Sequence, residues 1–209
     1  MFVKKLSADA FKNRMFQYFC FAFFNKTKIF MKKQLIATLV GGLILFFWQF
    51  LSWSVLNVHA ANFQYTANQD KIMETLVQNL DEGSYMLPQA PPGSSPEEQQ
   101  AYMESQSGKP WTTISYHKAF NTNMGMNMFR GFVIDLVAVF LLVWLLLKSA
   151  NLDFKTALLS ALAVGTIAYL TIPYLNSIWF DENTIGYIID LVAQWGLVGV
   201  WLGWWLTKR

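Results

Sequence analysis

Four long apolar segments divide the chain, and each is long enough to cross a bilayer, which takes about 20 mostly apolar residues. The apolar runs are residues 35–56, 131–147, 156–180 and 185–207. The first and third carry no charge, and the other two are interrupted only by Asp135 and by Asp190. Inside lipid, only helices satisfy the backbone N–H and C=O groups of such segments. The pattern therefore predicts four transmembrane helices, at residues 31–56, 129–149, 155–180 and 185–207.

The polar segment at residues 57–128 carries its own signals for secondary structure. A periodic apolar stripe predicts a helix from Asn68, as the N-cap, to about Leu80. Ser95, Pro96 and Glu98 form a capping-box pattern at the start of a second helix. The stretches "SYMLP" and "PWTTISYHKAF" are typical of strands. We expect a small α+β cap of two helices on a two-stranded ribbon.

The flanking charges predict which side each loop occupies. One side holds the Lys and Arg residues next to the apolar segments, and the other holds the acidic segment 57–128 and the short turn at residues 181–183. Basic flanks face the cytoplasm. The expected fold is an all-α integral membrane protein with both termini cytoplasmic and an extracytoplasmic α+β insertion between helices 1 and 2. The basic residues that decide this are Lys32, Lys33, Lys148, Lys155, Lys208 and Arg209.

Composition supports this class and narrows the chemistry. Of 209 residues, 54% are apolar and only 14% are charged, which is typical of a small membrane protein. The single cysteine, Cys20, permits no intrachain disulfide. No motif for a metalloprotease, a serine hydrolase or a phosphate-binding loop occurs. We expect no enzymatic activity, no catalytic residue and no cofactor.

Residues 1–30 are a basic, aromatic leader, and two interpretations of them remain. They form an interfacial anchor, or translation starts at Met31, where "MKKQ" adjoins the first apolar segment as a natural start does. Because the leader supplies the excess of basic residues, the net charge gives no reason to expect a nucleic-acid partner. Cleavage after Ala60 is also open, although the long apolar segment before it favours an uncleaved helix.

Several stretches resemble a family of small, uncharacterised four-helix bacterial inner-membrane proteins. They are "WQFLSWSVLNVH", "GSYMLP", "SPEEQQ" and "DLVAQWGLVG". The resemblance spans roughly residues 31–205 and implies this topology and a bacterial inner-membrane location. The family has no assigned activity, so the resemblance implies no role for any residue.

An octapeptide occurs twice in the chain. "GFVIDLVA" starts at Gly131 and "GYIIDLVA" at Gly186, with six of eight letters identical and Asp135 and Asp190 at the same position. The two copies lie at the same place in helices expected to run in the same direction. They therefore favour an internal repeat of two helical hairpins. We expect both carboxylates to face the interior of the bundle, because lipid-facing charges are disfavoured.

The expected polar cluster gathers around these two aspartates. It comprises Asp135, Asp190, Gln194, Arg130, His59 and His117. Two histidines and two carboxylates suffice for a metal site, but their spacing has no metal-ligand pattern, so we expect no metal. On the last helix Gly196, Gly199 and Gly203 form a small-residue face for close helix packing within the bundle or in a homo-oligomer.

Two function classes remain open from the sequence. The first is a non-enzymatic accessory protein, anchored in the lipid bilayer, whose cap docks an extracytoplasmic protein partner. The alternative is a small ion or solute carrier that uses Asp135 and Asp190. A cavity that reaches the aspartates favours the carrier, whereas an exposed apolar patch on the cap favours docking.

Overall fold

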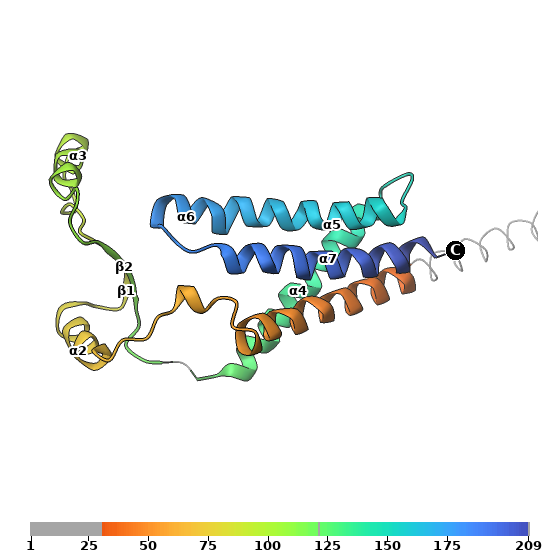
Figure 1. The fold of residues 1–209 in the computed structure, drawn as a ribbon, viewed down its shortest axis with the longest axis horizontal. Helices are drawn as coiled ribbons and strands as arrows, with labels where there is room; N and C mark the ends of the chain where they lie inside the picture. The colour runs from red at the N-terminus through yellow and green to blue at the C-terminus, as the bar shows by residue number, and fades with distance from the viewer. Residues whose placement is uncertain (1–30, 121, 209) are drawn as a thin grey trace, which may run out of the picture. The chain divides into compact units, whose positions relative to one another are not determined.

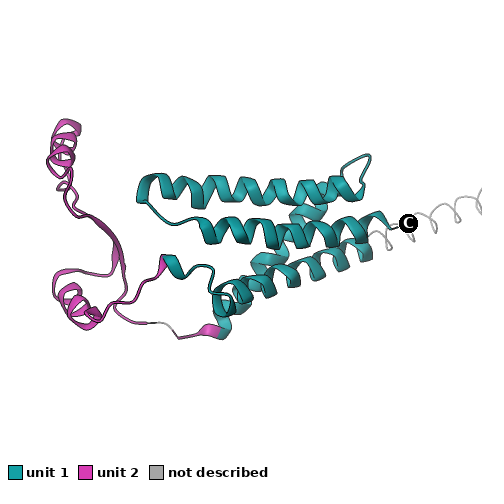
Figure 2. Cartoon of the chain, in the orientation of Figure 1, with its two compact units in different colours: residues 1–61, 125–209 teal, residues 62–124 magenta. Residues whose placement is uncertain are grey.

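The computed structural model of the chain describes residues 31–120 and 122–208 (Figure 1). The chain divides into two compact units. Unit 1 comprises Met1–Ala61 and Gly125–Arg209, and unit 2 comprises Asn62–Met124 (Figure 2). Residues 1–30, the expected leader, lie outside the described part of the chain.

Unit 1 is built from four helices that are long and apolar enough to span a membrane, as the sequence predicted. The first, Met31–Val55, ends in the π-helical segment η1 (Leu51–Val55). The second is α4 (Met124–Leu146). The third is one continuous rod of three segments, and the fourth is α7 (Ile185–Thr207) (Figure 1). The segments of the third are α5 (Phe154–Tyr169), the π-helix η3 (Leu170–Tyr174) and α6 (Leu175–Phe180).

The start of α4 differs from the expected boundary at residue 129. The helix begins at Met124, so "MGMNM" forms its first turns and does not belong to the cap. Methionine is a good helix former, so these residues can continue the helix. They add little cost, because the long apolar part of α4 already stabilises the helix. The bounds of α7 coincide with the predicted segment 185–207.

The first helix packs antiparallel to α7 along most of its length. Lys33, near its start, donates from Nζ to the carbonyl oxygens of Leu206 and Lys208 at 2.9 and 2.7 Å. These bonds satisfy carbonyl groups at the C-terminal end of α7, where a cation is favoured. The indoles of Trp201 and Trp205 donate to carbonyl oxygens of the first helix. The start of the first helix and the end of α7 therefore lie at the same end of unit 1.

Glycines allow close helix approach at two other contacts. A Cβ on Gly41 of the first helix would come within 2.6 Å of Val139 on α4. Between α5 and α7, Cβ atoms on Gly199 and Gly203 would meet Leu158 and Phe154 at 3.0 and 2.8 Å. Gly199 and Gly203 therefore lie at a tight helix contact, as small residues do where backbones approach closely.

Gly196 does not share this contact within the chain, and its expected role in packing between copies stays a prediction. A Cβ added there would meet no described atom within 4 Å. At this level the small residue lies on the opposite helix: a Cβ on Gly165 of α5 would lie 2.4 Å from Cδ1 of Trp195. The bulky indole fills the space between the two helices, so the packing needs a glycine on α5 and not on α7.

Unit 2 contains two helices and a two-stranded antiparallel sheet, as predicted. They are α2 (Gln69–Asn79), β1 (Gly83–Leu87), α3 (Pro96–Ser105) and β2 (Thr112–Tyr116), with Gly83 opposite Tyr116 and Leu87 opposite Thr112.

The helix caps in unit 2 follow the sequence signals only in part. The capping box at α3 is complete: Ser95 Oγ accepts from the Glu98 N–H at 3.2 Å, and Glu98 Oε2 accepts from the Ser95 N–H at 2.8 Å. Asn68 holds the N-cap position of α2, but its side chain makes no capping hydrogen bond. That part of the prediction was wrong because the backbone of Asn68 lies outside the extended region that aims a cap side chain at the helix.

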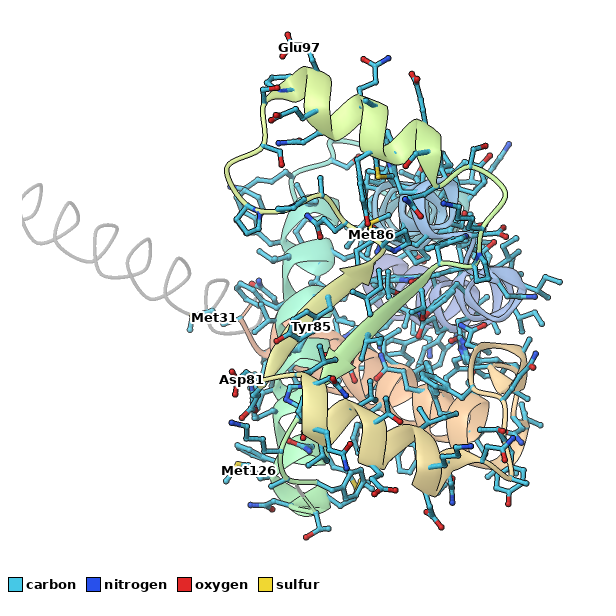
Figure 3. The ribbon with its side chains drawn as sticks, turned by 90° about the vertical axis from the view of Figure 1, so that its left-hand side faces the viewer. Met31, Asp81, Tyr85, Met86, Glu97 and Met126 are labelled. Atoms are coloured by element: carbon cyan, nitrogen blue, oxygen red, sulfur yellow. The ribbon has the colours of Figure 1, made fainter. Side chains whose placement is uncertain are left out.

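Asp81, between α2 and β1, ties the sheet to the end of the preceding helix. Its backbone carbonyl accepts from the hydroxyl of Tyr85 at 2.9 Å (Figure 3). Its carboxylate accepts from Lys118 Nζ at 3.1 Å, and this hydrogen bond raises the pKa of Lys118. These contacts join the segment before β1 to the segment after β2.

Candidate functional site

A left-handed turn after the first helix places His59 back against that helix. The π-helical segment η1 ends with the Leu56 N–H donating to the Leu51 carbonyl, and the Val58 N–H then reaches the Ser52 carbonyl at 3.1 Å. Asn57 between them has φ 56°, which asparagine tolerates better than most residues. The chain therefore reverses, and π-helical turns of this kind are frequent at functional sites.

Asp190 is the centre of the polar cluster that this turn creates. Its Oδ1 accepts from the hydroxyl of Ser52 at 2.6 Å and from the indole N–H of Trp48 at 2.9 Å. Its Oδ2 lies 2.8 Å from Nε2 of His59. Asp190 and His59 are 7% and 3% exposed, so all of these bonds lie inside unit 1. Three donors from one short segment thus hold a carboxylate that comes from α7.

The imidazole of His59 is fixed by aromatic rings on both sides. It stacks on Trp53 with a centroid separation of 3.9 Å and meets the ring of Tyr187 edge-on at 4.9 Å. The other nitrogen, Nδ1, has no hydrogen-bond partner among the described residues. Gly186 permits this arrangement, because a Cβ there would lie 2.7 Å from Nδ1 and 2.8 Å from the Val58 carbonyl oxygen.

The contacts of His59 leave one of its ring nitrogens without a partner. Nε2 lies 2.8 Å from Asp190 Oδ2, whereas the buried Nδ1 meets no hydrogen-bonding group among the described residues. Leaving a buried polar atom unsatisfied costs about 1–3 kcal/mol. The site around Asp190 therefore combines a buried acidic side chain with an imidazole that is only partly satisfied.

The arrangement does not activate a nucleophile, despite the presence of Ser, His and Asp. In a catalytic triad the histidine lies between the serine and the aspartate. Here the aspartate lies between the other two, and the Ser52 hydroxyl donates to Asp190. Ser52 is also 0% exposed. The geometry therefore fits binding at the carboxylate and does not fit acyl transfer at the serine.

A cavity of about 230 Å³ opens beside Asp190, between α5–η3 and α7. Gln194 lines it one helical turn beyond Asp190, and its buried Oε1 has no hydrogen-bond partner among the described residues. Asp190 thus lies between two π-helical segments: its carboxylate contacts Ser52 of η1, and residues of η3 line the same cavity as Asp190. The cavity walls are Gly165, Ala168, Tyr169, Ile172, Pro173, Tyr187, Leu191 and Trp195.

Asp135 occupies a separate position against the first helix. Its Oδ1 accepts from the amide of Gln49 at 2.9 Å, and Asp135 is 4% exposed. Because Gln49 follows Trp48 in the same helix, the two carboxylates meet that helix at nearly the same level, about 1.5 Å apart along its axis. Asp135 does not line the cavity beside Asp190. The two copies of the octapeptide therefore differ in their surroundings.

The structure brings together half of the expected polar cluster. Asp190 and Gln194 line the cavity and His59 contacts Asp190, whereas Asp135 binds Gln49 instead. Arg130 is exposed on α4, and no described ion pair joins it to Asp135. His117 lies in unit 2, where its Nδ1 is 3.2 Å from Glu82. Within residues 31–120 and 122–208, no group of three or more His, Cys, Asp or Glu residues is placed to hold a metal ion.

Trp48 and Ser52 were missed in the sequence, although they make two of the three bonds to Asp190. They are four residues apart, so both lie on one face of the first helix. A serine and an indole one turn apart in an uncharged apolar segment are a weak signal for a polar face. These two residues indicate a polar contact only when an acidic residue on another helix is known to lie opposite them.

Comparison of the chain with models of known protein families, with curated proteins and with solved structures finds no match. The resemblance to small bacterial inner-membrane proteins thus stays an expectation, and the geometry of the described residues carries the functional argument.

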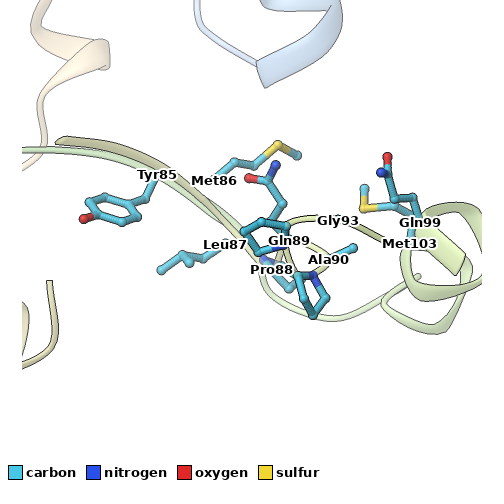
Figure 4. A pocket seen from close by; sticks show the side chains of 11 residues that line it. Tyr85, Met86, Leu87, Pro88, Gln89, Ala90, Gly93, Gln99 and Met103 are labelled. Carbon is cyan, nitrogen blue, oxygen red and sulfur yellow. The ribbon is translucent and has the colours of Figure 1, made fainter. Parts of the chain in front are cut away.

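Unit 2 has a hollow of its own, of about 570 Å³. It lies where β1 runs into the proline-rich loop and faces α3, which contributes Gln99 and Met103 (Figure 4). Its lining carries no charged side chain. On α2, the apolar residues Ile72, Met73 and Val77 are 47%, 46% and 61% exposed. Within unit 2, these side chains therefore form an uncovered apolar stripe.

Proposed function

We propose that this chain is a multi-pass protein of a bacterial inner membrane with both ends in the cytoplasm and unit 2 outside. Four helices long and apolar enough to span a membrane support insertion. Their outward faces expose large apolar side chains such as Phe140, Ile167 and Val200, which would be costly in water and suit lipid. The orientation rests on the lysines and arginines that flank the helices.

Within this membrane protein, we propose that Asp190 binds a cation or a proton, and that the protein is a small carrier. The observation that supports this most is the position of Asp190, an acidic residue that is buried and lines a cavity. A charge inside a membrane helix costs about 2.5–3.5 kcal/mol even on the lowest scales, so its retention favours a functional role. A cation in the cavity would compensate the negative charge.

The proposal assigns different roles to the two aspartates. Asp190 faces the cavity, beside the unpartnered Oε1 of Gln194, and is the exchange site. Asp135 binds Gln49 outside that cavity and ties α4 to the first helix, which is a structural role. The carrier expected from the sequence used both carboxylates, whereas the geometry favours a carrier that uses one.

Purified protein in proteoliposomes tests the carrier proposal. Proton or cation flux would be followed with a trapped pH-sensitive dye under an imposed cation gradient. Asp190→Asn should reduce flux at least tenfold, and Asp135→Asn should keep most of the flux while lowering the melting temperature. Equal flux for the wild type and Asp190→Asn, with both folded, would overturn the proposal.

Docking of an extracytoplasmic protein partner through unit 2 remains a second proposal. It is supported by the exposed stripe of Ile72, Met73 and Val77 on α2, because exposed apolar patches mark interaction sites. A paired Ile72→Glu and Val77→Glu variant should lose a cross-linked partner recovered with the wild type from native membranes. The same partner recovered with both proteins would rule out this stripe as the docking surface.

A further inference from the structure

We infer that the ligand of the Asp190 cavity is a small organic cation, namely an amine or a quaternary ammonium ion. This inference rests on the proposed function, since it names the class of cation that the carrier would take. It is drawn from the size of the cavity, from the aromatic rings in its walls and from the small number of oxygen atoms that it offers.

The size of the cavity suits a ligand smaller than a typical drug molecule. Its volume of about 230 Å³ is below the roughly 300–1,000 Å³ of pockets for drug-sized ligands. A bare metal ion or a proton would leave most of this space unfilled by the ligand. A compact organic cation with a few methyl or methylene groups would contact the walls on several sides.

The walls combine one anionic group with aromatic and apolar surface. Tyr169, Tyr187 and Trp195 line the cavity together with Asp190. Aromatic rings within about 6 Å attract cations through their negative faces, and such cages recognise quaternary ammonium groups. Two of the rings are held in place: the Tyr169 hydroxyl donates to Thr184 Oγ1 at 3.1 Å, and the Tyr187 ring packs edge-on against His59.

Gln194 adds a polar contact that discriminates among organic cations. Its Oε1 is buried and unpartnered within the described chain, so an N–H group of a primary amine would find an acceptor there. A buried acceptor left unsatisfied costs about as much as a lost hydrogen bond. An amine with N–H groups therefore satisfies Gln194 and is attracted by the charge of Asp190, whereas a quaternary ammonium ion uses only that charge and the rings.

The same lining is poor in ligands for an inorganic cation. Its side-chain oxygens are those of Asp190, Gln194, Tyr169 and Tyr187, and three donors already occupy the Asp190 carboxylate. Hard metal cations need about six or more oxygen ligands to replace their water shell. The cavity can therefore replace the loosely held water of an organic cation more readily than the water shell of sodium or calcium.

Equilibrium binding to the full-length protein in detergent tests this inference, with radiolabelled tetramethylammonium and methylammonium as probes and unlabelled potassium and sodium as competitors. We expect both organic probes to bind and potassium to compete at least tenfold more weakly. Asp190→Asn should weaken binding at least tenfold. Tyr187→Leu should weaken it roughly threefold to thirtyfold, as loss of a cation–π contact implies.

Matched variants separate loss of the ring from loss of the fold. Asp135→Asn, outside the cavity, should bind as the wild type does, and Tyr187→Phe, which keeps the ring, should bind better than Tyr187→Leu. If Tyr187→Leu does not fold, as judged by its melting temperature, Tyr169→Leu takes its place.

The outcomes distinguish this inference from the proposed function. If potassium competes as well as the organic probes and the ring variants bind normally, the organic class is wrong and the carrier proposal stands. If no probe binds while Asp190→Asn abolishes flux, the ligand class is again wrong. If no probe binds and Asp190→Asn leaves flux unchanged, both are wrong.

Discussion

His59 and Asp190 lie 131 positions apart in the sequence, yet their side chains meet at 2.8 Å inside unit 1. The contact joins the turn after the first helix to the first third of α7. It depends on the π-helical end of the first helix and on the left-handed backbone of Asn57. The turn therefore ends the first helix and also places the imidazole of His59 against the carboxylate of Asp190.

Replacing His59 by phenylalanine should destabilise unit 1. Phenylalanine retains ring packing against Trp53 and Tyr187 but cannot donate to Asp190. A hydrogen bond to a charged group contributes about 1.5–3 kcal/mol, and a denaturant melt in detergent would show a loss of that size. His117→Phe is the control, since His117 is exposed in unit 2. Equal losses for the two variants would show that the His59 contact contributes little.

The glycines that open the two octapeptides should respond differently to alanine. A Cβ on Gly186 would lie 2.7 Å from Nδ1 of His59, whereas a Cβ on Gly131 would meet nothing described within 4 Å. Gly186→Ala should displace His59, lower the melting temperature and reduce binding at Asp190. Gly131→Ala should be neutral or slightly stabilising, because alanine favours helices. Identical effects in both melting and binding assays would mean that the two copies are equivalent.

Asp153 should stabilise the start of α5 in a pH-dependent way. Its carboxylate accepts from the Thr156 N–H at 2.7 Å, and hydrogen bonds from Thr156 lower the pKa of Asp153 below its ordinary value of 3.8. A group with a lowered folded pKa stabilises the fold above its unfolded pKa and loses that contribution as the pH falls. Asp153→Ala should therefore lower the melting temperature at pH 7.

The difference between Asp153→Ala and the wild type should shrink as the pH falls below about 4. Melts at pH 7, 5 and 3.5 would measure it. A difference that stays constant across this range would mean that the charge of Asp153 does not contribute to the cap.

The proposed orientation can be read from a single cysteine in unit 2. With Cys20 replaced by serine, Ser94→Cys should react with a membrane-impermeant maleimide in intact spheroplasts, because unit 2 would lie outside. The lysine-rich ends should be protected, so Lys208→Cys in the same background serves as the control. Labelling of Lys208→Cys before lysis and of Ser94→Cys only after it would reverse the orientation.

The long helices were predictable because the length of an apolar run is a local property of the sequence. The four segments appear as four helices, and the capping box at Ser95 and Glu98 forms as its letters indicate. The start of α4 at Met124 was missed because polar and methionine residues continue a helix without any apolar signal. Asn68 was correctly predicted at the N-cap position of α2, but its side-chain hydrogen bond does not form, because that bond depends on backbone angles that the residue type alone does not fix.

The candidate site was predictable only in its residue types. An aspartate in an apolar helix marks a polar site wherever it occurs, so Asp190 stood out, and Gln194 followed from its position one turn away. Its donors Trp48 and Ser52 could not be assigned, because that requires knowing that the first helix runs antiparallel to α7 at this register. The separation of Asp135 from the cavity is likewise a property of packing and not of the repeated octapeptide.

Carbodiimide labelling tests the role of Asp190 most directly. Dicyclohexylcarbodiimide enters apolar regions and modifies carboxyl groups that take up a proton there, and mass spectrometry assigns the modified residue. We predict that saturating methylammonium slows the labelling of Asp190, which lines the cavity, at least tenfold, and leaves the labelling of Asp135, bound to Gln49 outside the cavity, unchanged. Labelling of Asp190 that no cation slows, or equal slowing at both aspartates, would contradict the assignment of Asp190 as the cation-binding residue.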